Sequence, residues 1–516
     1  MTAPVPSIAP ITAYIEETPR DADGRYRYRN YIGGAFVDPV TKEWLETTDP
    51  VMGDVWALIP RSSGEDAERA VNAAHAAFDE GAWPALSASA RGALMRKLGD
   101  LITENAEWLA RIEMRDNGKL MAELAMQMRY MANYYYYYGG LADKVEGTVI
   151  PTDKPGVFNY TKPEPVGVVT CIMPWNSPLP LMSLKLAPAL AAGCTTVLKP
   201  SEFTSASVLE FVKLVQAAGF PPGVVNVVTG YGAEIGDALI SHPKVERIAF
   251  TGGPEAGRII NEKAARHMKR VTMELGGKSP NIVFADADLD QATKGAVAGI
   301  FAASGQTCVA GSRLLVEDSI HDEFVERVKR FIADVRFGHP ADPQTQIAPI
   351  STRPQLEKIK SYVEIAKADG ATLAAGGEVA AVPDYPNGLF FKPTIFVGVT
   401  NDMRIAQEEV FGPVLSVIRF KDEDEAVRIA NDTQFGLAAG IWTQSMRRAL
   451  TMANRVRAGT VWVNNYRSTS TTSPFGGFKM SGIGREGGID GIREYMETKS
   501  VWLSTATDIP NPFIRR

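Results

Sequence analysis

From Val166 onward the chain alternates short apolar, β-branched runs with alanine-rich segments of helical spacing. Uninterrupted apolar runs of this length are typical of strands buried on both faces. The alternation therefore predicts a doubly wound α/β domain with a parallel sheet, the architecture that binds dinucleotides. The predicted strands are 166–173, 195–198, 224–228, 247–250 and 271–274, and the predicted helices are 183–192, 205–218, 234–241 and 255–265.

A second alternating block follows and predicts a second α/β domain. Two further segments stand apart from both blocks: residues 145–165 are polar, β-prone and rich in proline, and residues 498–503 form a matching strand candidate. The strands expected in the second block are 281–284, 314–316, 414–420, 438–442 and 460–463.

Composition narrows the class of protein. At 516 residues, with 45% hydrophobic and 22% charged residues, the chain suits a multidomain globular protein. A net charge of -6 argues against a nucleic-acid partner. The N-terminus has no signal-peptide pattern, and no apolar run is long enough to span a membrane. We expect a cytoplasmic protein without a membrane partner.

Cysteine and histidine usage bears on redox state and metals. Three cysteines without a CxxC pair do not make a disulfide framework, and a reducing compartment fits them. Cys171 and Cys194 lie in or beside apolar strands, where a cysteine is usually a small buried side chain. Five scattered histidines show no metal-binding spacing, so no metal site is predicted.

Cys308 is different, because glycine and polar residues surround it in the run 305–312. Glu274, in 274–280, and Asn176, in 174–176, lie upstream. A thiolate that attacks a carbonyl carbon places negative charge on the carbonyl oxygen, which an Asn amide and the Cys308 N–H can hold. Glu274 can then activate water to release the acyl group from sulfur.

These segments, in this order, resemble the aldehyde dehydrogenase superfamily in its hydrolytic, non-CoA-acylating form. Segments 199–202, 250–253, 408–413 and 474–482 also match, so the resemblance runs from about Tyr31 to about Trp502. It implies a cofactor domain (1–144 and 166–276), a catalytic domain (277–485), and an oligomerisation arm with a C-terminal strand (145–165 and 486–516). It also implies a homodimer or homotetramer.

The resemblance implies an NAD site. Lys199 and Glu202 would hold the adenosine ribose, and a 2′-phosphate would meet the Glu202 carboxylate, so NAD is favoured over NADP. The alternative is a Lys199–Glu202 surface ion pair of little consequence. Gly253 replaces the small hydroxyl residue usual in the family, which removes one donor to phosphate. The expected cofactor residues are Trp175, Lys199, Ser201, Glu202, Thr251, Gly252, Gly253, Gly257, Leu275, Glu409 and Phe411.

Lys185 and Glu486 match family positions that carry the proton away from the base; alternatively, they form a buried ion pair that orders a loop. The loop 467–472 is polar where several relatives are aromatic, so the tunnel suits an aldehyde with a carboxylate or several oxygens. Arg467 either faces this tunnel or braces the loop. The expected tunnel residues are Ser177, Leu181, Leu184, Thr307, Val309, Arg467, Thr469 and Phe475.

Two rival functions remain open at this stage. The first is a dehydrogenase specialised for one semialdehyde or heterocyclic aldehyde. The second is a catalytically idle structural or binding protein on the same scaffold, which the presence of Cys308, Glu274 and Asn176 disfavours. The tyrosine run 134–138 would place rings on every face of a helix, which favours packing at a subunit boundary over ligand stacking.

Overall fold

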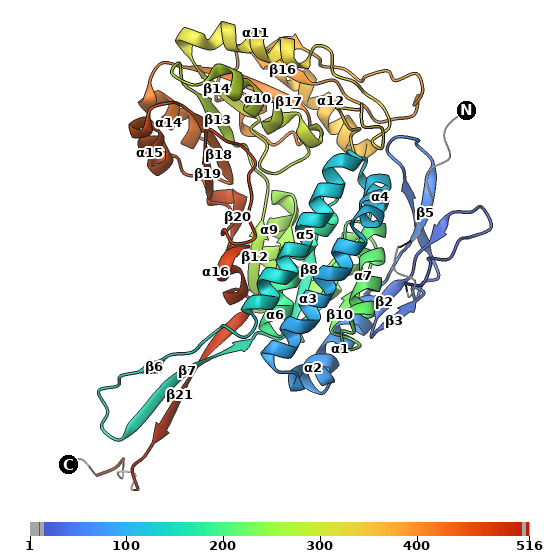
Figure 1. The fold of residues 1–516 in the computed structure, drawn as a ribbon, viewed down its shortest axis with the longest axis vertical. Coiled ribbons are helices and arrows are strands. Elements are labelled where there is room, and N and C mark those ends of the chain that lie inside the picture. Colours follow the sequence, from blue (N-terminus) through green and yellow to red (C-terminus); the bar gives the residue numbers. More distant parts are fainter. Residues whose placement is uncertain (1–9, 11–14, 508–511, 515–516) are drawn as a thin grey trace.

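The computed structural model describes residues 10, 15–507 and 512–514. Two large sheets, each covered by helices, form the body of the molecule, and a narrow arm of strands extends away from it (Figure 1). A small sheet at the N-terminal side contains β1 (Tyr26–Arg27), β5 (Val55–Pro60) and β4 (Trp44–Thr48). The predicted α/β architecture with two parallel-sheet units is confirmed.

The first sheet has eight strands, and its five central strands are parallel. The strands at both edges run antiparallel to their neighbours. In spatial order they are β20 (Gly482–Ile483), β12 (Arg270–Glu274), β11 (Val245–Thr251), β8 (Val168–Ile172), β9 (Thr195–Lys199), β10 (Val225–Val227), β2 (Asn30–Ile32) and β3 (Ala35–Val37).

Side chains of β8, β9 and β11 enter two different cores on opposite faces of the sheet, which is why most residues of these strands are buried. In β9, Leu198 packs into the larger core and Val197 into the smaller one on the opposite face. The smaller core is covered by α1 (Gly64–Asp79), α8 (Gly232–Ile240) and α9 (Pro254–Ala265). The larger is covered by α3 (Ala88–Glu104), α4 (Ala106–Asn117), α5 (Met121–Leu141), α6 (Pro178–Ala192) and α7 (Ala206–Ala218), with the short α2 (Ala82–Ala85) beside them.

Helix α6 begins five residues earlier than the predicted start at Ser183. Pro178 and Pro180 concealed this first turn in the sequence. The N–H groups of a first helical turn have no helical acceptor, so proline is tolerated there. The earlier start places Ser177 at the N-cap, directly after Asn176.

The second sheet has seven strands, parallel except for the edge strand β15. The sequence pattern missed β15 and β16, which have four residues each. The order is β15 (Thr372–Ala375), β16 (Thr394–Val397), β17 (Val414–Phe420), β14 (Arg313–Glu317), β13 (Pro280–Val283), β18 (Ala438–Trp442) and β19 (Thr460–Val463). One face carries α12 (Arg353–Ala368), α14 (Glu423–Asn431) and α15 (Met446–Arg455), the other α10 (Leu289–Ile300) and α11 (His321–Ile332), and the four-residue α13 (Arg404–Gln407) precedes β17.

The arm contains β6 (Val149–Ile150), β7 (Val157–Pro165) and β21 (Met496–Ser504). Strand β21 pairs antiparallel with β7 along its whole length, as the matching strand candidate predicts. Large apolar side chains remain exposed on the arm, among them Phe158 at 45%, Trp502 at 58% and Leu503 at 48%.

Beyond the second sheet the chain returns to the first one. Strand β20 pairs with β12, and α16 (Gly488–Arg493) packs against α6. This return lies before residue 485, where the sequence analysis placed the end of the second domain. A two-residue strand leaves no pattern in the sequence that could have marked it.

Candidate active site

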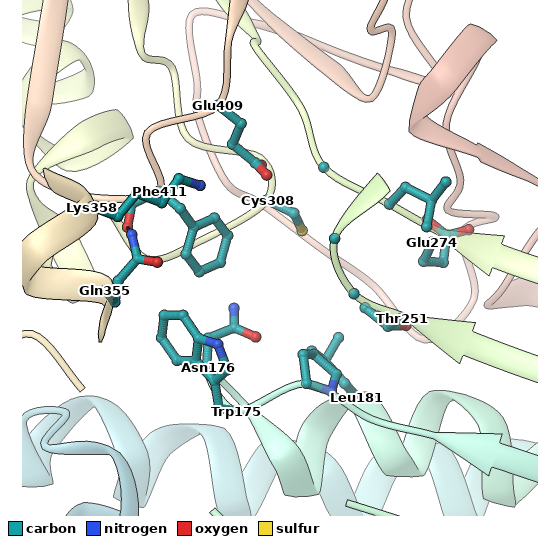
Figure 2. A pocket seen from close by; sticks show the side chains of 15 residues that line it. Trp175, Asn176, Leu181, Thr251, Glu274, Cys308, Gln355, Lys358, Glu409 and Phe411 are labelled. Atoms are coloured by element: carbon teal, nitrogen blue, oxygen red, sulfur yellow. Dashed lines mark hydrogen bonds between the residues drawn. The ribbon is translucent and has the colours of Figure 1, made fainter. Parts of the chain in front are cut away.

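Loops from both sheets meet around one cavity between them. The first sheet contributes the segments after β8, β11 and β12. The second sheet contributes the Cys308 loop and the segment before β17. Figure 2 shows Asn176, Cys308 and Phe411 around a common space, with Glu274 to one side of it. The lining residues are Pro174, Trp175, Asn176, Leu181, Thr251, Gly252, Gly253, Glu274, Leu275, Gly276, Cys308, Gln355, Lys358, Glu409 and Phe411.

Cys308 follows the 3-10 turn η1 (Ala302–Gly305), where the backbone reverses through positive φ angles. At Gly305 φ is +71°, and a Cβ there would lie 2.1 Å from the Gly412 carbonyl oxygen. Only glycine lets this loop approach the neighbouring segment so closely. Burial raises the pKa of the Cys308 thiol to about 12, and the negative charges of Glu409 and Glu274 also raise it.

Both the side chain and the backbone of Asn176 are held. Its Nδ2 donates to the Gln306 carbonyl at 2.9 Å, and its backbone carbonyl accepts from Asn117 Nδ2 at 3.4 Å. The Gln306 side chain is anchored in turn, since its Oε1 accepts from the Ser351 N–H at 2.9 Å. One Nδ2–H is engaged in this way, and the other is available for an oxygen in the cavity.

Glu274 ends β12 and is only 4% exposed. Among the residues that the structure describes, neither of its carboxylate oxygens has a hydrogen-bond partner. Burial raises its pKa well above the usual range, the Glu486 charge raises it further, and Lys185 and Arg485 lower it. A buried carboxyl of this kind binds a proton readily, as a general base must.

Lys185, on α6, and Glu486 form a buried ion pair. Lys185 Nζ also donates to Thr251 Oγ1 at 2.6 Å, and Glu486 is tied to Phe475 by two backbone hydrogen bonds. This pair therefore connects three segments around Glu274.

The comparisons with known proteins agree with this geometry. The family model described as "Aldehyde dehydrogenase family" matches residues 36–501. A dehydrogenase of (Z)-2-((N-methylformamido)methylene)-5-hydroxybutyrolactone from Acinetobacter baylyi is 47% identical over 95% of this chain and 100% of its own length. Betaine aldehyde dehydrogenase from Bacillus subtilis is 42% identical over 94% of this chain and 99% of its own. The crystal structure of Staphylococcus aureus betaine aldehyde dehydrogenase in complex with NAD+ superposes with a TM-score of 0.93 at 40% identity, covering 94% of this chain and 97% of that one.

The chain belongs to the aldehyde dehydrogenase family. The resemblance given by its motifs is confirmed, and the chain is an enzyme that oxidises an aldehyde to the carboxylic acid.

On the cofactor side of this aldehyde dehydrogenase, a turn leads from Thr251 into α9, whose N-cap is Gly253. A Cβ at Gly257 would lie 2.6 Å from the Leu275 side chain, so this glycine lets α9 pack against the loop after β12. No atom of a described residue lies within 4 Å of a Cβ placed at Gly253, so the N-terminus of α9 is open.

Lys199 ends β9, and its buried Nζ donates to the Pro200 carbonyl at 3.1 Å. Burial lowers its pKa, and the nearby Glu202 charge raises it. Ser201 Oγ accepts from the Phe203 N–H, and its carbonyl accepts from Ser205 Oγ. Lys199, Ser201 and Glu202 therefore lie at the carboxyl edge of the sheet, although none of them lines the central cavity.

On the opposite wall, Glu409 Oε1 accepts from the Gly277 N–H at 2.9 Å. Phe411 has a positive φ of 60° and meets Trp175 edge to face, with ring centroids 5.3 Å apart. Burial raises the Glu409 pKa, whereas Lys358 and Lys278 lower it.

The sequence analysis missed Gln355 and Lys358, which line the cavity from α12. Gln355 Nε2 donates to the carbonyls of Val410 and Phe411 at 2.9 Å and so anchors the Phe411 segment. Both residues lie on an amphipathic helix, where polar side chains usually face solvent, so no local signal marked them.

The predicted tunnel residues are only partly brought together. Leu181 lines the cavity, whereas Leu184 packs against the larger core of the first sheet. Val309 packs against a core of the second sheet, and its carbonyl accepts from Tyr466 Oη at 2.9 Å. Thr307 Oγ1 is buried without a hydrogen-bond partner among the described residues.

The loop 467–472 is fixed by the tyrosine-rich helix α5. Tyr130 Oη donates to the Thr469 carbonyl at 3.3 Å and accepts from the Thr471 N–H at 3.0 Å. Within the tyrosine run, Tyr135 and Tyr138 are fully buried inside this chain, and packing at a subunit boundary stays a prediction.

Among residues 10, 15–507 and 512–514, no group of His, Cys, Asp and Glu has an arrangement that would bind a metal ion. Within the same part of the chain no helix is both long and apolar enough to cross a membrane.

Proposed function

We propose that this enzyme oxidises aldehydes through a thioester on Cys308, with Asn176 as oxyanion donor and Glu274 as general base. The observation that carries the proposal is the convergence of these three side chains on one cavity, at the edge where the strands of the first sheet end. Each has the property that its role requires: a thiol facing the cavity, an oriented amide with a free N–H, and a buried carboxyl of raised pKa.

The first step is attack of Cys308 Sγ on the aldehyde carbon. The thiol proton passes to Glu274, a carbon–sulfur bond forms, and the carbonyl oxygen takes up negative charge. Asn176 Nδ2 and the Cys308 backbone N–H donate to this oxygen. Bound NAD would supply the acceptor for the hydride that leaves the same carbon, and Cys308 would then hold the acyl group as a thioester.

The second step is hydrolysis of the thioester. Glu274 removes a proton from water, the resulting hydroxide attacks the acyl carbon, and the carbon–sulfur bond breaks to release the acid. Glu274 must lose its first proton before it can act again. We assign this transfer to Lys185 and Glu486, whose buried ion pair adjoins Glu274.

The residues around the cavity suit a dinucleotide. The open N-terminus of α9 after Thr251 and Gly252 can accept phosphate, while Glu409, Phe411 and Trp175 surround the position expected for the nicotinamide ribose and ring. We further propose that Glu202 makes NAD the preferred cofactor over NADP, because its carboxylate would repel a 2′-phosphate.

A narrower candidate function is a dehydrogenase specialised for one semialdehyde or heterocyclic aldehyde. The name of the Acinetobacter relative favours it, since that enzyme acts on a substituted 5-hydroxybutyrolactone. As a matter of general chemistry, such a lactone is the ring-closed form of a 4-oxo acid, an aldehyde that also carries a carboxylate.

We also propose that the arm joins subunits of a homodimer or homotetramer. Its exposed apolar side chains need a covering surface in water, and β19 is an edge strand on which another strand can pair. Deleting residues from Lys499 onward should lower the molar mass measured by light scattering; an unchanged mass would refute the assignment. A cytoplasmic location stays a prediction.

The decisive experiment mixes the purified enzyme with NAD or NADP and a panel of aldehydes sorted by length and charge. Reduced cofactor is followed by absorbance, and the acid product is identified. An idle protein on this scaffold would reduce neither cofactor with any aldehyde.

A further inference from the structure

One face of α5 is directed at the loop 467–472. Glu123, Gln127 and Tyr130 are spaced four and three residues apart and therefore share a side of the helix. Tyr130 holds the loop at Thr469 and Thr471, and Glu123 accepts from Arg467 Nη2 at 3.4 Å. Gln127 Nε2 also donates to Glu123 at 3.4 Å.

Arg467 is held in place, but its hydrogen-bonding capacity is not filled. Its backbone has a positive φ of 66°, and its guanidinium reaches the Ala298 carbonyl at 3.3 Å and Glu123 at 3.4 Å. Both contacts are longer than the usual 2.7–3.2 Å range, and a guanidinium carries five N–H donors. The Gln127 Oε1 atom is buried without a partner among the described residues.

A second cation lies behind this cluster. Lys119, which precedes α5, is 2% exposed, and its Nζ donates to Ser177 Oγ. Burial lowers its pKa, the charges of Glu123, Glu113 and Cys308 raise it, and that of Arg467 lowers it. Its hydrogen bond to Ser177, the residue after Asn176, connects Lys119 to the active-site segment. Glu113, on the other side, accepts from the Leu179 N–H at 3.2 Å and thereby supports the start of α6.

We propose that Glu123, Gln127 and Arg467 recognise a carboxylate at the far end of the substrate, so that the preferred substrate is an aldehydic acid. This inference rests on the proposed function. Glu123 already shows that a carboxylate fits against Arg467, and its single long contact is weak enough for a substrate carboxylate to replace it. The side-chain amide of Gln127 can form a hydrogen bond with the Glu123 carboxylate that the substrate displaces. Glu123 is thus a specificity-determining residue that competes with the substrate for Arg467.

Binding without turnover tests this directly. The NAD-loaded Cys308→Ala enzyme is titrated by calorimetry with 4-oxobutanoate and with butanal, which have equal chain lengths but differ by the carboxylate. Arg467→Met in this background should weaken the binding of 4-oxobutanoate roughly 10- to 150-fold more than the binding of butanal. Glu123→Gln should lower the dissociation constant of 4-oxobutanoate by up to about 5-fold.

The double variant decides whether Glu123 acts through Arg467. In the presence of Arg467→Met, Glu123→Gln should no longer tighten 4-oxobutanoate. Arg447→Met is the matched control, because Arg447 makes a similar single contact to Glu423 at 3.2 Å on the exposed face of α15. It should change neither affinity.

The inference would be overturned if Arg467→Met and Glu123→Gln each changed the affinity for both aldehydes equally. It would also be overturned if Glu123→Gln still tightened the binding of 4-oxobutanoate in the double variant. Turnover of the enzyme with Cys308 intact separates the two proposals. Oxidation of butanal with no preference for 4-oxobutanoate refutes carboxylate recognition and leaves the proposed function standing. Failure to oxidise any aldehyde refutes the proposed function, while the calorimetry still decides on the carboxylate.

Discussion

Cys308 and Glu274 form the chemical centre of the cavity, and Glu409, Phe411 and Trp175 form its cofactor wall. The ionisable groups of these two regions differ in how they are held. At the centre, Glu274 is buried without a hydrogen-bond partner among the described residues, and the Cys308 thiol has a pKa raised to about 12. On the cofactor wall, Glu409 is anchored by the Gly277 N–H. Lys199, at the sheet edge outside the cavity, is anchored by the Pro200 carbonyl. The carboxyl proposed as the base is left without a hydrogen-bond partner at an energetic cost, whereas the charged groups expected to bind the cofactor are held in place.

The largest expected effect comes from removing the nucleophile. Cys308→Ala should abolish turnover, by at least about 10⁴-fold, because no thioester can form. The NAD dissociation constant should stay within about 3-fold, since the thiol contributes little to dinucleotide binding. Steady-state kinetics and an NAD titration measure both quantities. Dehydrogenase turnover in this variant would remove Cys308 from the chemical centre.

Replacing the base should separate the two chemical steps. Glu274→Gln removes the acceptor of the thiol proton as well as that of the water proton. The single release of reduced cofactor per active site should therefore be slowed and then stall at the thioester, with steady-state turnover reduced about 10²- to 10⁴-fold. In the unmodified enzyme the carboxyl must be deprotonated to act. Because its pKa is raised, hydrolysis should speed up as pH rises through that pKa. The stopped-flow burst and a pH series of kcat test this; a wild-type steady-state rate would indicate another base.

Some residues of the cavity could be predicted from the sequence, and others could not. The apolar strands, and with them the loops that present Asn176, Glu274 and Cys308, follow from periodicity and from motifs a few residues long. Gln355 and Lys358 were not found, because their role arises from the packing of α12 against a loop more than 50 residues away. The Arg467–Glu123 pair was also beyond reach, since it joins positions 344 residues apart. Local patterns predict strand ends, but not which distant helix faces them.

A smaller effect is expected at Glu202, which lies at the sheet edge outside the cavity. Glu202→Ser should raise kcat/KM for NADP relative to NAD by about 10-fold or more, because a neutral hydroxyl replaces the charge that repels the 2′-phosphate. Glu202 is partly exposed, so solvent screening keeps the gain well below that of a buried pair. Glu202→Asp, which keeps the charge, is the matched control. An unchanged ratio in Glu202→Ser would show that this residue does not contact the ribose.

The smallest effect concerns Lys185, for which proton transfer and loop ordering make different predictions. Its positive charge lowers the Glu274 pKa, so Lys185→Met should raise that pKa further and move the rise of kcat to higher pH. Turnover should then fall at neutral pH and recover in alkaline buffer. Lys185→Arg, which keeps the charge, should retain the original profile. Because removing one partner of a buried ion pair is destabilising by about 3–5 kcal/mol, thermal unfolding must be measured alongside. A loss of the same size at every pH, together with a lower Tm, would assign Lys185 and Glu486 to ordering the loop around Glu274 and leave the proton to another route.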